Sequence, residues 1–246
     1  MPDSKHNVPD RFDFDAPRNT GVFICQRVRD GAPILHVSHD DDGAWQFMCG
    51  GDHGDAAGDP GSLACLECTV AGDPSLNAVA DLPRGYSADR DHPDAAWARY
   101  DPHEDFIDEA VAQYGWAVQM IPGEGDEPPF AYTVGLFKSY GHPEIITLGL
   151  RLEVLKAMLN ACGERVRRGE QLPVGTPFDG VLDDYPVALR EVRAIDSYKR
   201  HVGYAGWFNQ GWGFPLLQLV WPDKAGRFPG DRGAPASLTE QQPLLP

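Results

Sequence analysis

The sequence predicts an α+β fold of two small modules, each with a mainly antiparallel sheet and a few flanking helices. Short β-rich segments and helical segments follow one another without the regular strand–helix–strand alternation of a parallel sheet. The length of 246 residues leaves room for two small domains. A helix start at Asp101 separates the β-rich segments into two groups, so we expect the boundary near residue 101.

The first module is expected over residues 21–100, after a polar, acidic and proline-containing arm at residues 1–20 that we expect to be mobile. Aromatic and β-branched residues bounded by turn residues predict four strands, the first two joined as a hairpin, at residues 21–28, 33–39, 44–49 and 63–70. Asp73, as N-cap, and Pro74, in the first turn, predict a short helix over residues 73–83.

The second module is expected over residues 101–232, followed by a flexible tail at residues 233–246. Asp101 and Glu104 form an Asp variant of the capping box, which predicts a helix start. This helix ends at Gly115 and carries five apolar residues on one face: Phe106, Ile107, Ala110, Val111 and Tyr114.

Five strands and two further helices are predicted in the second module. The strand segments are apolar and bounded by turn residues, at residues 116–121, 130–136, 141–150, 187–195 and 215–222. The clearest helix covers residues 151–168, where apolar side chains recur at three- and four-residue steps: Leu152, Leu155, Leu159, Cys162 and Val166. A short helix is predicted over residues 197–205.

The chain is acidic, with 37 Asp and Glu against 21 Lys and Arg and a net charge of −16. Residues 1–103 carry 18 acids and 8 bases, and residues 104–246 carry the remaining 19 and 13. Both halves repel phosphate, so we expect no nucleic-acid partner. An acidic surface attracts a basic protein, although it also simply raises solubility.

No apolar run approaches the ~18–20 residues of a membrane span, so no membrane association is expected. The N-terminal residues lack the basic and apolar regions of a secretory signal. The five cysteines are odd in number. We therefore expect a cytoplasmic protein with reduced thiols.

Four residues have ligand types that zinc accepts: Cys65 and Cys68 form a Cys-x₂-Cys pair, with Cys49 and His53 upstream. The segment around the pair resembles a strand, in which residues three apart point to opposite faces. The spacing therefore favours packing cysteines over a zinc site, and no cofactor is predicted.

The sequence contains no nucleophile elbow, phosphate-binding loop or metalloprotease motif. The most interesting titratable residue is His142, which follows Gly141 between two predicted strands, with Asp223 or Glu144 as a possible partner in an acid–base pair. A cleft around it would be lined by Tyr132, Thr133, Gln218 and Asp223. The competing interpretation is a turn histidine bonded to a neighbouring carbonyl or carboxylate.

Residues 206–214 are rich in aromatic side chains and glycine. Trp207 and Trp212 either close the core beneath this loop or stay exposed as contacts for a partner. Trp221, beside Asp223, belongs to the same set of candidate site residues, and Trp45 is a further candidate anchor in the first module.

Several segments of the second module, residues 115–118, 130–136, 141–146, 217–223 and 226–229, resemble in order the bacterial domain-of-unknown-function family 4262. The resemblance covers residues 104–232 and implies a compact bacterial α+β domain without an established activity. Residues after Pro229 depart from the pattern, with Gly230 and Asp231 in place of an aromatic residue and an acid.

Shorter motifs of the first module, at residues 34–37, 42–47 and 73–76 together with Arg90, resemble the domain-of-unknown-function family 2185. That family is grouped with immunity proteins of bacterial polymorphic toxins. The resemblance covers residues 21–100 and implies a partner-binding role without catalytic residues.

These observations predict a cytoplasmic, non-enzymatic bacterial protein that binds another protein, with immunity against a basic toxin as the sharpest version. The alternative is an enzyme or small-ligand binder with a cleft around His142. Nothing in the sequence indicates an oligomeric state.

Overall fold

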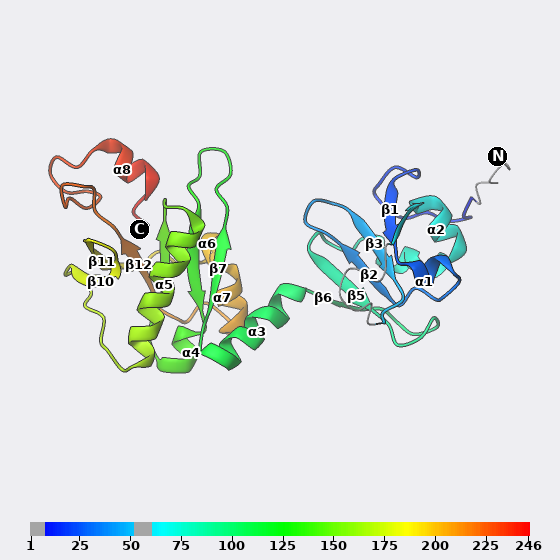
Figure 1. The fold of residues 1–246 in the computed structure, drawn as a ribbon, viewed down its shortest axis with the longest axis horizontal. Coiled ribbons are helices and arrows are strands. Elements are labelled where there is room, and N and C mark those ends of the chain that lie inside the picture. The colour runs from blue at the N-terminus through cyan, green and yellow to red at the C-terminus, as the bar shows by residue number, and fades with distance from the viewer. Residues whose placement is uncertain (1–7, 52–60) are drawn as a thin grey trace. The chain divides into compact units, whose positions relative to one another are not determined.

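The computed structural model describes residues 8–51 and 61–246 (Figure 1). The chain divides into two compact units, Met1–Asp105 and Phe106–Pro246. Each unit contains a six-stranded, mostly antiparallel sheet with helices, which confirms the predicted α+β class. The module limits predicted from the sequence stay predictions. Among the described residues, no helix has both the length and the apolar character needed to cross a membrane.

The sheet of the first unit has the strand order β4-β1-β3-β2-β5-β6. Its strands are β1 (Gly21–Ile24), β2 (His36–His39), β3 (Trp45–Met48), β4 (Ser62–Cys65), β5 (Tyr86–Asp89) and β6 (Ala98–Tyr100). β1 and β3 are parallel, whereas the other neighbours are antiparallel. The helices are α1 (Gln26–Arg29), α2 (Leu66–Gly72) and the 3₁₀ helix η1 (Pro74–Val79).

Two strand predictions for this unit are wrong. The expected hairpin is absent because the chain turns through α1 after β1, and β1 then pairs with β3 and β4. The expected strand over residues 63–70 stops at Cys65, where α2 begins. Leu66 and Val70, four residues apart, are both fully buried, a spacing that a helix places on one face.

Residues 8–20 are described, and they contribute to the core of the first unit, which differs from the predicted mobile arm; residues 1–7 lie outside the described residues. Phe14 is 6 % exposed, and its ring meets Trp45 edge-on at 5.0 Å between centroids. Asp13 donates its backbone N–H to the Asn77 side chain over 2.9 Å. Burial of an aromatic ring supplies the apolar contact that holds this segment.

The sheet of the second unit has the strand order β10-β11-β12-β9-β8-β7. Its strands are β7 (Ala117–Ile121), β8 (Phe130–Val134), β9 (Glu144–Leu148), β10 (Phe178–Leu182), β11 (Tyr185–Val192) and β12 (Leu216–Val220). Only β9 and β12 are parallel among these described pairs. The five predicted strands are confirmed, and β10 was not predicted.

Helices cover both faces of this sheet (Figure 1). They are α3 (Pro102–Tyr114), α4 (Leu136–Tyr140), α5 (Leu152–Arg167), α6 (Ile195–His201), α7 (Gly203–Phe208) and α8 (Ala236–Gln241). The predicted stripe of α5 packs on one face, where Leu155 and Leu159 belong to the same core as Ile145. On the other face, α6 and α7 cover Tyr132 and Ile146. Successive strand residues therefore serve two different cores.

The end of the chain is folded, which corrects the prediction of a flexible tail. Residues 236–241 form α8, and Leu238 and Leu245 are 4 % and 6 % exposed. The Pro246 carbonyl accepts hydrogen bonds from the backbone N–H groups of Arg193 and Ala194, both at 3.0 Å. Two apolar anchors and these hydrogen bonds hold a segment whose local composition is typical of a loop.

Candidate functional site

The residues of the predicted cleft do not converge. Tyr132 and Thr133 are neighbours on β8, so their side chains point to opposite faces of the sheet. Tyr132 is buried under α7, and burial raises the pKa of its hydroxyl while a hydrogen bond with the Tyr204 backbone opposes this. Thr133 bonds to Glu144. One cleft lined by both residues is not formed.

His142 is half-buried in the turn before β9. Its Nδ1 lies 2.7 Å from the carbonyl oxygen of Pro143. Burial lowers the pKa of the imidazole, and the hydrogen bond to this carbonyl partly opposes the effect. This is the geometry of the turn histidine in the competing interpretation.

Glu144 is the most unusual carboxyl group of the second unit, because it is fully buried. Its Oε2 accepts a hydrogen bond from Thr133 Oγ1 at 2.6 Å, and its Oε1 accepts from the backbone N–H of Gly135 at 2.8 Å and of Phe137 at 3.2 Å. Burial raises the pKa of Glu144 to about 7, while these hydrogen bonds act in the opposite direction. The carboxyl group caps the start of α4 and has no contact with His142 among the described interactions.

Gln218 and Trp221 hold the C-terminal segment in place. Gln218 Oε1 accepts from the Leu245 backbone N–H at 2.9 Å, and its Nε2 donates to the Pro243 carbonyl at 2.9 Å. Gln242 binds the Trp221 backbone twice, accepting from its N–H at 3.1 Å and donating to its carbonyl at 2.6 Å. Gln218 and Trp221, which were predicted to belong to a ligand site, therefore make structural contacts with the C-terminal segment.

We expect Gln242→Ala to loosen the C-terminal segment. It leaves the N–H and carbonyl of buried Trp221 without partners, which costs about 2 kcal/mol. Limited proteolysis should then cut within residues 233–246 faster than in the parent protein. Gln241→Ala is the matched control, because the neighbouring side chain is exposed. Equal cleavage rates for both variants would contradict the role of Gln242.

The remaining candidate residues, Asp223, Trp207, Trp212 and Trp45, each have a different environment. Asp223 pairs with Arg227 through Oδ2 at 2.6 and 2.8 Å, and this pairing lowers the pKa of the carboxyl group. Trp207 is 37 % exposed. Trp212 instead lies over Gly206, where an added Cβ would meet its ring at 2.4 Å. Trp45, 5 % exposed, is a core residue and does not present a surface for a partner.

The zinc candidates do not assemble among the described residues. Cys65 ends β4 and donates a hydrogen bond to the Arg18 carbonyl at 3.4 Å, and Cys68 belongs to α2. Cys49 follows β3, and His53 lies outside the described residues. Across residues 8–51 and 61–246, no group of three His, Cys, Asp or Glu side chains is placed to hold a metal ion.

An apolar groove that was not predicted from the sequence lies at the β7 edge of the second sheet. Its volume is about 360 Å³. α3 and α5 form its two sides and the start of β7 forms its floor, and its lining consists of Phe106, Ala110, Tyr114, Trp116, Ala117, Val118, Lys156, Asn160 and Glu164.

Only part of the apolar face of α3 is buried against the second unit. The exposed part of that face forms one side of the groove. Ile107 is fully buried, whereas Phe106 and Tyr114 are 56 % and 52 % exposed. Phe106, Ala110 and Tyr114 follow one another at four-residue steps, so they form a row along the side of the helix. The predicted stripe contained this signal, but the wall supplied by α5 depends on tertiary structure.

Trp116 lines the groove and is held against α5. Its indole ring is 5 % exposed, and its Nε1–H donates to Asn160 Oδ1 on α5 at 3.0 Å. The ring lies so close to Gly163 that a Cβ there would be 2.4 Å from Cε2. A glycine in the middle of α5 thus makes room for the indole.

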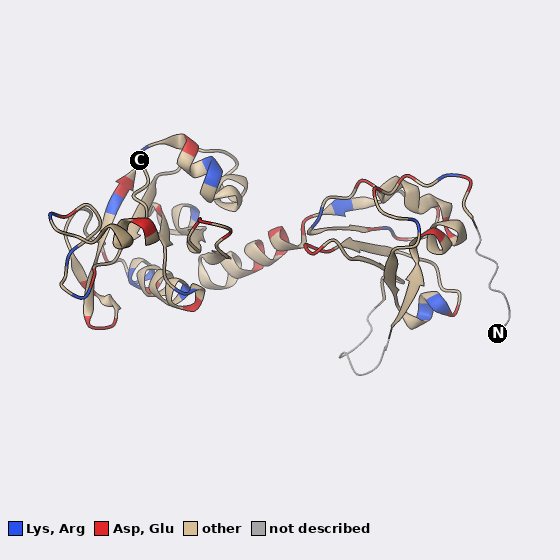
Figure 2. Ribbon diagram, turned by 90° about the horizontal axis from the view of Figure 1, so that it is seen from above, with Lys and Arg blue, Asp and Glu red and all other residues tan. Residues whose placement is uncertain are grey.

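α3 is negatively charged, but none of its acids lines the groove. This helix contains no Lys or Arg, and four acids lie in its first two turns: Glu104, Asp105, Asp108 and Glu109 (Figure 2). Lys156 is the single cation among the groove-lining residues. The apolar lining, together with the acids elsewhere on α3, suits a partner surface that is apolar in its centre and basic at its edge.

A family model described as "Domain of unknown function (DUF4262)" matches residues 110–235. The match begins in the middle of α3 and includes most of the groove. A search of the curated proteins finds no match, and neither does a search of the solved structures.

Proposed function

We propose that this chain, which belongs to the DUF4262 family of domains of unknown function, is a protein-binding module. Its groove between α3 and α5 would bind a basic amphipathic helix of the partner. The observation that carries the proposal is the pair of exposed aromatic rings, Phe106 and Tyr114, over a groove of 360 Å³. Exposed aromatic side chains in a concave apolar site are typical anchors of protein interfaces.

The exposed row on α3 is as long as about two turns of a partner helix. Phe106 and Tyr114 are eight residues apart, which corresponds to ~12 Å along a helix axis. A partner helix presents apolar side chains over the same distance with i, i+4 and i+7 spacing. Basic residues on the flanks of that helix would be attracted by the acids of α3.

The finer form of the proposal is an immunity-type role against a basic toxin in a bacterial cytoplasm. It rests on the relation of residues 21–100 to family 2185 that the sequence motifs predict, and on the net charge of −16. The acidic residues would steer the encounter, and the groove would supply the short-range apolar contact.

The test uses a defined peptide of about five helical turns, with leucine on one face and lysine on the other. Two matched peptides serve as controls, one with the same composition in scrambled order and one with glutamate in place of lysine. Binding is followed by the NMR signal of the Trp116 indole N–H, which lies in the groove. We expect this signal to shift with the lysine peptide alone, and to shift less as salt rises from about 0.05 to 0.5 M.

Substitutions in the groove give the second arm of the test. Phe106→Ala and Tyr114→Ala should each weaken binding about tenfold, equivalent to about 1.4 kcal/mol. Trp207→Ala is the matched control, since this aromatic side chain is exposed but lies outside the groove. Equal binding of the scrambled or anionic peptide, or a larger loss with Trp207→Ala, would refute the proposal.

A further inference from the structure

Cys25 and Cys49 lie at the ends of two adjacent parallel strands of the first unit. β1 pairs with β3 in the register Phe23 to Gln46 and Ile24 to Phe47, which places Cys25 beside Met48 and one position from Cys49. Adjacent strands are ~4.8 Å apart, which brings the two backbones within the range that a disulfide spans. The Cys25 side chain is hydrogen-bonded to the Cys49 sulfur.

The surroundings of the two thiols differ. Cys25 is 1 % exposed, whereas Cys49 is half-buried and reaches solvent. The Arg27 guanidinium and the Gly51 backbone both hydrogen-bond to the Cys49 sulfur. A Cβ on Gly51 would lie 2.7 Å from Arg27 Nη1 and 3.6 Å from Cys49 Sγ. The guanidinium group and the sulfur therefore both lie next to this glycine.

Charge and hydrogen bonding favour the thiolate of Cys49. Burial raises the pKa of Cys49, but the hydrogen bonds from the Gly51 backbone, Cys25 and Arg27, together with the Arg27 charge, outweigh it and lower the pKa. A thiol of lowered pKa that reaches solvent, next to a second thiol, is the arrangement found in oxidant-sensitive cysteine pairs.

We propose that Cys49 and Cys25 are a modification site, at which a hydroperoxide converts the two thiols into a reversible intramolecular disulfide. The proposal goes beyond partner binding and does not depend on the groove. The accessible Cys49 attacks the hydroperoxide, and the buried Cys25 then forms the disulfide with it. Arg27 positions the Cys49 thiolate.

The reaction balances as two steps. The Cys49 thiolate attacks the terminal oxygen of the hydroperoxide, the O–O bond breaks, the departing alkoxide or hydroxide takes a proton, and Cys49 becomes a sulfenic acid. Cys25 then attacks the Cys49 sulfur, the S–S bond forms, and the S–O bond breaks as water leaves with the Cys25 proton. Two thiols are oxidised by two electrons in total, and a dithiol reductant restores them by exchange.

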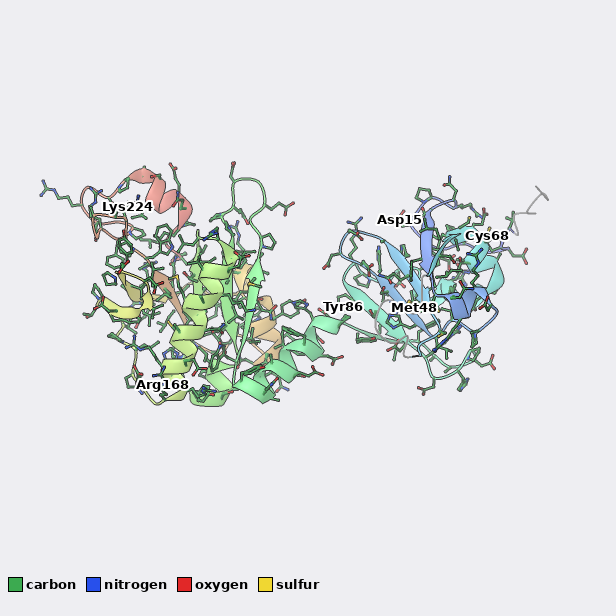
Figure 3. All side chains as sticks on the ribbon, viewed as in Figure 1. Asp15, Met48, Cys68, Tyr86, Arg168 and Lys224 are labelled. Carbon is green, nitrogen blue, oxygen red and sulfur yellow. The ribbon has the colours of Figure 1, made fainter. Side chains whose placement is uncertain are left out.

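The other cysteines have different environments. Figure 3 labels Met48, the residue before Cys49, on β3 and Cys68 on α2. Cys65 is bonded to the Arg18 carbonyl. Cys162 is fully buried in the second unit, and burial raises its thiol pKa to about 12. We therefore expect the Cys25–Cys49 pair to be oxidised ahead of Cys65 and Cys162, and the peptide map decides between this pair and Cys68.

The test treats the full chain with hydrogen peroxide, alkylates the remaining thiols and maps the peptides by mass spectrometry. We expect the loss of two of the five free thiols and one disulfide-linked peptide pair containing Cys25 and Cys49, both reversed by a dithiol. Mapping of the unmodified protein under brief alkylation should show Cys49 as the fastest-reacting cysteine. These two measurements need no substitution and so do not depend on the folding of a variant.

Variants separate the assigned roles. Cys49→Ser should abolish the thiol loss, and Cys25→Ser should leave a sulfenic acid on Cys49 that a 1,3-diketone traps. Cys65→Ser is the matched control and should oxidise like the parent protein. Arg27→Gln should slow alkylation of Cys49 several-fold at neutral pH and move its pH profile upward. A disulfide between Cys65 and Cys68, or no intramolecular disulfide at all, would overturn the proposal.

Discussion

Trp116→Ala should lower the free energy of unfolding of the second unit by about 3–5 kcal/mol. The indole ring is 5 % exposed and belongs to the core beneath α5. Its removal leaves a cavity and deprives Asn160 of the hydrogen bond at 3.0 Å. Trp207→Ala is the control: this ring is 37 % exposed, and its loss should cost about 1 kcal/mol or less.

Gly163→Ala tests the same contact from the opposite side. In the parent protein the new Cβ would approach the indole Cε2 to 2.4 Å, and such overpacking costs about 1–3 kcal/mol. In a Trp116→Ala background the obstacle is gone, and alanine should stabilise α5 by up to about 1 kcal/mol through helix propensity. The substitution should therefore change sign between the two backgrounds.

Both measurements need a probe that reports on the second unit alone. Cys162 provides it, because it is the single cysteine after residue 68 and is fully buried in the same core. Its rate of labelling in increasing urea gives the free energy of opening for each variant. A double-mutant cycle with no coupling between residues 116 and 163 would contradict the described contact.

Glu144→Gln should remove a pH dependence of stability. Burial raises the pKa of Glu144 to about 7 from its ordinary value of 4.5. The folded state therefore keeps the proton where the unfolded state has already released it. Stability contributed by this group is fully present below pH 4.5 and is lost as the pH rises through 7, by about 3 kcal/mol in total.

The glutamine variant is a close match for the protonated acid. Its carbonyl can accept from Gly135 and Phe137, and its amide can donate to Thr133. Urea unfolding at several pH values, again followed at Cys162, should show similar stability for both proteins near pH 4.5. The difference should then grow in favour of Glu144→Gln up to pH 8. The same slope in both proteins would exclude Glu144 as the titrating group.

Local sequence patterns correctly predicted those helices and strands whose apolar residues repeat at regular spacing. The stripe of α5 and the apolar runs of β8, β9 and β12 are each recognisable from a few neighbouring residues. α2 was mistaken for a strand because Cys, Thr and Val are common in strands, while the deciding feature was the burial of Leu66 and Val70 together. The C-terminal segment was mistaken for a tail because its partners, such as Gln218, are distant in sequence.

The same distinction applies to the sites. The exposed row on α3 could be seen in the sequence, but its function as one side of a groove depends on Trp116 and α5. Cys49 was examined for zinc together with Cys65 and Cys68, yet its neighbour in space is Cys25. That proximity follows from the parallel pairing of β1 with β3, which no local pattern indicates.

The second sheet pairs strands that are far apart in the sequence, and this affects how the chain folds during synthesis. β9 pairs with β12 in parallel, and Leu245 completes the core on one face of that sheet. Domains generally fold as units during synthesis, so we expect the first unit to fold before the second, whose core includes Leu245. During that interval β9 has an unpaired edge, so nascent chains stalled before β12 are the species that we expect chaperones to recognise.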